Sequence, residues 1–164
     1  MRLENLRIWF GDRAARHEGS LRGKWYSFPL DEEKTREDFG KGLRKIQLFA
    51  SEEFPPELCS KYYSIAELNS IYQSLKALDP VLLEHLAELM AAGYDLEDIE
   101  RIGSDFYYYE GCHSMAEVAE KKIMGSSLDV SDLLPEFLDF ERMGFLFKTE
   151  GNFVVCENGV LELY

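Results

Sequence analysis

The sequence predicts an α+β protein made of three small segments. Strand-like alternation with one short helix characterises residues 1–61, helical periodicity fills residues 62–103, and residues 104–164 combine helices with an antiparallel meander. The chain has 164 residues, of which 46% are hydrophobic and 13% aromatic, and this composition is too apolar for a disordered chain. We therefore expect three small domains with these boundaries.

One small sheet is expected in the first segment. Leu6, Ile8 and Phe10 alternate as one strand, residues 23–28 form a second, and residues 43–49 form a third. Residues 11–22 are expected to form a long loop between the first two strands.

One helix is expected before the third strand. Asp31 is placed to cap it, two glutamates follow in its first turn, and Gly40 ends it. Pro55 and Pro56 then interrupt the pattern, so the first domain boundary is expected within residues 50–62.

Capping signals begin the helices of the middle segment. Ser64 and Glu67 can form a capping box, in which each side chain accepts a hydrogen bond from the other residue's backbone N–H. The apolar stripe of the helix that follows is expected to face a core. It comprises Ile65, Leu68, Ile71, Tyr72 and Leu75.

A second helix is expected to begin at Pro80, with Asp79 as its cap, and to end at Gly93. His85 is interpreted as a histidine on the surface of this helix, and Asp95 begins a third helix. The apolar face of the second helix comprises Leu82, Leu83, Leu86, Leu89 and Met90.

The last segment starts with a strand over residues 106–109. Ser114 and Glu117 form a second capping box before a helix over residues 116–124, and a further helix is expected around residues 136–143.

The chain is expected to finish as an antiparallel meander of residues 145–149, 153–156 and 160–164. Asn158-Gly159 predicts a type I′ turn between the last two strands, because both central residues of that turn need a positive φ.

The charge is distributed unevenly along the chain. Residues 51–164 hold 23 Asp/Glu against 7 Lys/Arg, a net charge of −16, whereas residues 1–50 hold 8 against 11, a net charge of +3. Arg101 is the only base between Asp79 and Glu110. Such a surface repels nucleic acid and attracts proteins with basic clefts, although an acidic surface that serves only solubility remains an alternative.

The common spacing signatures of catalytic and metal sites do not occur. The sequence has neither C-x-x-C nor H-E-x-x-H, and Gly23-Lys24 followed by Trp25 does not complete a phosphate-binding loop. Glu110-x-x-His113 occurs once, whereas the di-metal helices that use this spacing need two copies. The sequence therefore predicts no enzyme, no catalytic residue, no cofactor and no bound metal.

Three cysteines, Cys59, Cys112 and Cys156, are far apart and odd in number, which favours reduced thiols over a disulfide framework. Cys112 next to His113 is interpreted as a loop thiol, with a thiol enzyme as an alternative. The sequence shows no secretory signal and no apolar run of membrane-spanning length, so a cytoplasmic protein is expected.

Five stretches resemble the ArdA-type antirestriction proteins, in the same order along the chain. They are EGSLRGKWYSFP at residues 18–29, YSIAELN at 63–69, FLDFERMG at 137–144, EGNF at 150–153 and ENG at 157–159. Together they span nearly the whole chain.

The resemblance implies three small domains in a row, an elongated homodimer, no catalysis and a bacterial host that carries the gene on a mobile element. It also implies that surface carboxylates imitate DNA phosphates and occupy the DNA-binding groove of a type I restriction-modification enzyme. The acids expected to form this surface are Asp79, Glu84, Glu88, Asp95, Glu97, Asp98, Glu100, Asp105, Glu110, Glu117, Glu120, Asp129, Asp132, Glu136, Asp139 and Glu141.

The sequence departs from the family in two places. QLFASEE at residues 47–53 stands where relatives have a more acidic segment, and Phe145-Leu146 replaces the Arg-Asp expected after Gly144. Both changes remove charge, so binding is expected to rest on residues 51–164. A diverged member that binds another nucleic-acid-handling protein and an acidic adaptor without mimicry remain alternatives.

The homodimer is expected to form through the last domain. Phe145, Phe147, Phe153 and Val155 are the candidate interface, since strands near the terminus offer edges that a two-fold partner can cover. The alternative is that these side chains fill the core of their own domain.

Overall fold

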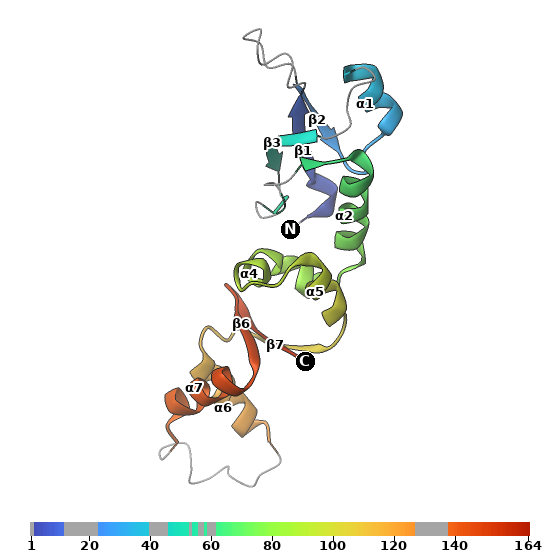
Figure 1. Ribbon diagram of the computed structural model, residues 1–164. Coiled ribbons are helices and arrows are strands. Elements are labelled where there is room, and N and C mark those ends of the chain that lie inside the picture. The colour runs from blue at the N-terminus through green and yellow to red at the C-terminus, as the bar shows by residue number, and fades with distance from the viewer. Residues whose placement is uncertain are drawn as a thin grey trace. The chain divides into compact units, whose positions relative to one another are not determined.

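The computed structural model describes residues 2–11, 23–39, 46–52, 54–55, 58, 62–126 and 138–164 (Figure 1). The chain divides into two compact units, Met1–Leu86 and Ala87–Tyr164. Each unit contains one antiparallel sheet and several helices, which confirms the predicted α+β class. The division into three domains stays a prediction.

The first unit holds a four-stranded antiparallel sheet in the order β2-β1-β3-β4. The strands are β1 (Arg7–Gly11), β2 (Gly23–Ser27), β3 (Ile46–Glu52) and β4 (Tyr62–Tyr63). A short 3-10 helix, η1 (Leu3–Asn5), precedes them. The first two strands are as predicted, and Leu6 and Ile8 are buried. The third strand ends at Glu52, three residues later than predicted, and residues 43–45 of the predicted strand lie outside the described residues. Of the expected loop over residues 11–22, Gly11 is the last residue of β1 and the rest lies outside the described residues.

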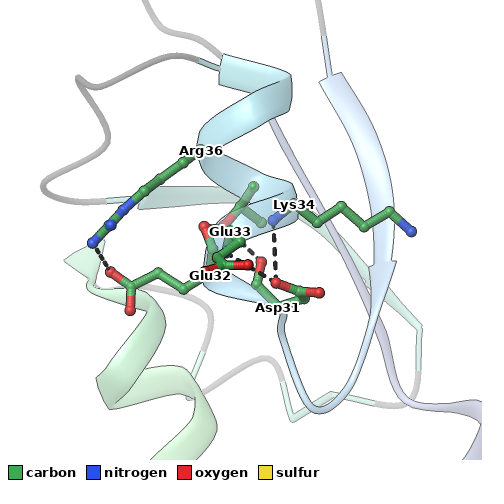
Figure 2. A network of polar contacts seen from close by, with 6 residues as sticks. Asp31, Glu32, Glu33, Lys34 and Arg36 are labelled. Atoms are coloured by element: carbon green, nitrogen blue, oxygen red, sulfur yellow. Dashed lines mark hydrogen bonds and ion pairs between the residues drawn. The ribbon is translucent and has the colours of Figure 1, made fainter.

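Helix α1 (Glu32–Phe39) starts where the sequence predicts it. Figure 2 shows the reason: an oxygen of the Asp31 carboxylate accepts hydrogen bonds from the backbone N–H groups of Glu33, at 2.9 Å, and Lys34, at 3.1 Å. Arg36 forms an ion pair with Glu32 one turn earlier. The predicted end at Gly40 lies outside the described residues.

Helix α2 (Ile65–Ala77) begins with the predicted capping box of Ser64 and Glu67, and Leu68 and Leu75 are fully buried. It belongs to the first unit through polar contacts as well. The Asn69 amide accepts a hydrogen bond from the Leu30 backbone N–H at 2.7 Å and donates one to the Leu30 carbonyl at 2.9 Å.

The single helix predicted from Pro80 to Gly93 is two short helices, α3 (Pro80–Glu84) and α4 (Leu86–Ala91). His85 caps the end of α3 with non-helical backbone angles, φ −100° and ψ 21°. Its side chain is 2% exposed, so the interpretation as a surface histidine was wrong. The reason is spacing: His85 follows the buried Leu82 by three residues and therefore lies on its apolar side.

Helix α4 ends at Ala91, two residues before Gly93, whose φ of 103° suits the glycine predicted to terminate this helix, and α5 (Leu96–Ile102) follows. As predicted, Asp95 caps α5, and its partner in a reciprocal capping box is Asp98. Ile99, on the inner face of α5, is fully buried.

The second unit contains a three-stranded antiparallel sheet in the order β5-β7-β6. Its strands are β5 (Phe106–Glu110), β6 (Asn152–Val155) and β7 (Gly159–Leu163), and every residue of the central strand β7 is buried. The two remaining helices are α6 (Met115–Met124) and α7 (Phe140–Glu150), which pack against each other.

The strand predicted over residues 145–149 is wrong, because these residues belong to α7, which also begins later than the helix predicted around residues 136–143. Phe140, Met143, Gly144 and Phe147 are the more buried residues, a helical spacing. A Cβ atom on Gly144 would lie 2.5 Å from the backbone of Met115, so only glycine allows this close packing of α7 on α6.

The hairpin between β6 and β7 was predicted, but its turn differs from the prediction. Cys156 N–H donates to the Gly159 carbonyl at 2.8 Å, so Glu157 and Asn158 are the central residues, and Gly159 lacks a left-handed φ. Glycine is needed there for another reason: a Cβ atom would lie 2.4 Å from the ring of Tyr108. Within the described ranges, no helix has the length and apolar character that a membrane crossing requires.

Candidate functional site

Most of the candidate acids are on the surface. Asp79, Glu88 and Asp98 are half-buried, and Asp129, Asp132 and Glu136 lie outside the described residues. Asp79 and Glu84 belong to the first unit and the other described acids to the second. The exposed members of the set are Glu84, Asp95, Glu97, Glu100, Asp105, Glu110, Glu117, Glu120, Asp139 and Glu141.

Several of these carboxylates hold the beginning of a helix. Asp79 accepts from the Val81 N–H at 2.8 Å, and Asp95 from the Asp98 N–H at 2.9 Å. Asp139 caps α7 in the same way through the Arg142 N–H, at 3.0 Å. A cap of this kind contributes about 1 kcal/mol, so these acids stabilise the fold whether or not they also bind a partner.

Glu117 has a similar role in a modified form. Ser114 Oγ accepts from the Glu117 N–H at 3.3 Å, as the predicted capping box requires. The Glu117 carboxylate, however, accepts from the His113 N–H at 2.7 Å, one residue before the position that the box predicts.

Other carboxylates are open to a partner. Over the residues that the structure describes, neither a hydrogen bond nor an ion pair engages the carboxylates of Glu84, Glu100, Asp105, Glu110, Glu120 and Glu141. These side chains are therefore the part of the predicted surface that has no structural role within the described fold.

Arg101 partly neutralises the acids of α5. Its guanidinium donates to Asp98 at 3.1 Å and to Glu97 at 3.4 Å, in pairs three and four residues apart. The Arg101 side chain is 69% exposed, and exposed pairs of this kind contribute only about 0–1 kcal/mol. The acids of α5 can thus exchange this internal cation for an external one at little cost.

A buried polar network in the second unit escaped the sequence analysis. Glu162, in β7, is 8% exposed; one carboxylate oxygen accepts from the Tyr109 hydroxyl at 2.7 Å, and the other forms an ion pair with Lys122. The Lys122 ammonium also lies over the rings of Phe153 and Phe147, 5.3 and 5.4 Å from their centres. The network joins α6 and α7 to the sheet.

The network shifts the acidity of its members. Burial raises the pKa of Glu162, but the hydrogen bonds from Lys122 and Tyr109 more than offset it, so the pKa lies below its usual value. Burial and the nearby Glu162 carboxylate raise the pKa of Tyr109. The position of Lys122 could have indicated this network in the sequence, because Lys122 follows the buried Val118 and Ala119 at helical spacing and so lies on the same face of α6.

The candidate dimer residues face different ways. Phe145 and Val155 are 67% and 43% exposed. Phe153 packs against the cluster of Tyr109, Cys112, Val118 and Val160, and Phe147 lies beside Lys122. Half of the set therefore contributes to the packing of its own unit, and the dimer interface stays a prediction.

Three basic residues in the described part of the first unit, Arg7, Lys24 and Arg36, pair with acids of the same unit. Lys24 forms an ion pair with Asp38, whose second oxygen accepts from the Tyr26 hydroxyl at 2.5 Å, and this joins α1 to β2. Hydrogen bonds from Lys24 and Tyr26 lower the pKa of Asp38. Arg7 likewise lies 3.6 Å from Glu52.

The described cysteines are buried thiols. Cys112 is 2% exposed and packs in the core, whereas His113 is on the surface. Burial, with the charge of Glu88, raises the pKa of Cys156 to about 12, so its thiol stays protonated at neutral pH. Cys59 lies outside the described residues.

Comparison with known proteins confirms the resemblance to the ArdA-type antirestriction family. A family model described as antirestriction protein (ArdA) matches residues 8–162 of the chain. A search of curated proteins found no match.

Proposed function

The chain belongs to the ArdA family of antirestriction proteins, and we propose that it inhibits a type I restriction-modification enzyme by occupying the groove that binds DNA. The observation that carries the proposal is the set of exposed carboxylates on α5, β5 and α6. They belong to a part of the chain, residues 51–164, with a net charge of −16. Catalysis has no part in this function.

The physical basis is competition for the same cations. Double-stranded DNA carries one negative charge per about 1.7 Å of its axis, and a groove that binds it is lined with Lys and Arg. Carboxylates held on rigid helices and strands offer the same sign of charge to that groove. Glu110 is exposed on β5, which pairs with the buried strand β7, Asp105 is exposed immediately before β5, and Glu120 is exposed on α6, so a stable core supports them.

We also propose that the protein acts as a homodimer in the bacterial cytoplasm, and that its gene travels on a mobile element. Phe145 and Leu146, 67% and 48% exposed on α7, are neighbouring apolar side chains that a second copy can cover. Light scattering at micromolar concentration measures the dimer, and a particle of 19.0 kDa, the mass of one chain, excludes it.

A second candidate function has one observation in its favour. Phe145 and Leu146 stand where the family carries charge, and both are on the surface. An apolar contact there fits a diverged member that binds a different nucleic-acid-handling protein.

The test is a DNA-binding assay with a purified type I restriction-modification enzyme and increasing amounts of this protein. We expect DNA to be displaced, and the inhibitor's affinity to fall with added salt, because exposed charges are screened over about 8–10 Å at physiological salt. DNA binding that persists at large excess of the protein contradicts the proposal. A complex that is insensitive to salt favours the second candidate.

A further inference from the structure

An open pocket of about 380 Å³ lies beside α5 in the second unit. Two tyrosines, Tyr94 and Tyr164, line it together with Asp98, Arg101, Ile102 and the chain at Ala92 and Gly93. Small-molecule sites in proteins have volumes of about 300–1,000 Å³, so this pocket is at the lower end of that range.

The lining suits a planar cation. A guanidinium stacks on the face of a tyrosine ring and pairs with a carboxylate through two parallel donors. Tyr164 is 74% exposed, so the face of its ring is accessible from solvent.

An arginine of this chain already shows which chemistry the pocket wall accepts. Arg101 binds Asp98 and Glu97 from the helix that forms the wall, at 3.1 and 3.4 Å. Because these pairs are exposed, their loss costs little when another guanidinium replaces them.

We propose that this pocket receives an arginine side chain of the partner protein, which stacks on Tyr164 and takes over the Asp98 carboxylate that Arg101 holds in the free protein. The identity of the partner, a protein with a basic DNA-binding groove, rests on the proposed function. The pocket itself is tested without that partner.

The probe is a hexa-arginine peptide, titrated into the full-length protein at low salt by calorimetry, with NMR to locate the contact. We compare wild type, Tyr164→Ala and the control Tyr107→Ala, a tyrosine of β5 that is 55% exposed and does not line the pocket. Tyr164→Ala should weaken binding about two- to fivefold, the effect of an exposed cation–π contact, while Tyr107→Ala leaves it unchanged.

The second comparison keeps the change in charge constant. Arg101→Gln should tighten peptide binding about two- to fivefold, because it frees Asp98 and Glu97, whereas Arg142→Gln on α7 removes an equal charge elsewhere. Equal effects of the two arginine variants, or of the two tyrosine variants, overturn the pocket and leave only general attraction between charges. Circular dichroism of each variant confirms that it is folded.

The outcomes separate the two proposals. If the pocket variants bind the peptide as their controls do, and the protein displaces DNA from the enzyme, the pocket proposal alone is refuted. If the pocket variants change peptide binding as predicted, but the protein does not displace DNA from the enzyme, the proposed function alone is refuted.

Discussion

Charge reversal at Glu97 tests whether the acids of α5 contact the target. The chain supplies a matched control, because Glu97 pairs with Arg101 in α5 as Glu32 pairs with Arg36 in α1, each four residues apart on a helix surface. Glu97→Lys and Glu32→Lys both change the net charge by +2 and both replace an ion pair with a like-charge pair. The two variants therefore differ mainly in location.

The expected loss of stability is small and similar for both variants. Each loses a pair worth about 0.2–0.5 kcal/mol and gains a repulsion of about the same size, so unfolding becomes easier by about 0.4–1 kcal/mol. For a chain of this length, 1 kcal/mol lowers Tm by roughly 2–4 °C. Thermal melts of the two proteins check this equality before any binding is compared.

Inhibition should weaken only when the charge is reversed in α5. If Glu97 meets a cation of the target, the reversal loses an exposed pair of about 0.2–1 kcal/mol and adds a repulsion of about the same size. The inhibitor concentration that displaces half of the DNA should then rise roughly two- to thirtyfold for Glu97→Lys and remain near wild type for Glu32→Lys. Equal inhibition by the two folded variants refutes the assignment of the contact to α5.

Three further predictions concern the fold that carries this surface. The pKa of Glu162 is lower in the folded protein than in the unfolded chain, so its contribution to stability is present above the unfolded pKa and disappears as pH falls through the folded pKa. As pH is lowered below 4.5, urea melts should therefore show a smaller loss of stability for Glu162→Gln than for wild type. Parallel losses would contradict the role of the network. Asp95→Ala removes the capping box of α5 and should lower the free energy of unfolding by about 0.5–2 kcal/mol, whereas Asp95→Ser should recover most of it; chemical denaturation measures both, and equal losses would exclude capping as the cause. Gly144→Ala forces a Cβ atom against the backbone of Met115 and should cost about 1–3 kcal/mol, while an unchanged melting temperature would mean that α7 moves away from α6 freely.

Local signals in the sequence were sufficient for the helix beginnings. Asp31, Ser64, Asp79 and Asp95 cap helices as predicted, because a cap is a contact between residues two or three positions apart. The same locality explains why α5 was placed correctly although it is short. Charge is also a property of the sequence alone, so the acidic character of residues 51–164 needed no structure.

Errors arose where a distant residue determines the outcome. Residues 145–149 have the apolar content of a strand, but they continue α7, whose Gly144 packs closely on the backbone of Met115 in α6, a contact that the local sequence does not reveal. Likewise, the ring of Tyr108 over Gly159 explains the glycine that the sequence alone assigned to a turn.

The sequence by itself determined the α+β class, the capped helices and the sign of the surface charge. Only the tertiary structure divided the carboxylates into those that cap helices, those that face solvent, and Glu162, which is buried against Lys122 and Tyr109. The physical reason is that a carboxylate has the same charge wherever it stands, whereas its exposure and its hydrogen-bond donors depend on which elements pack around it.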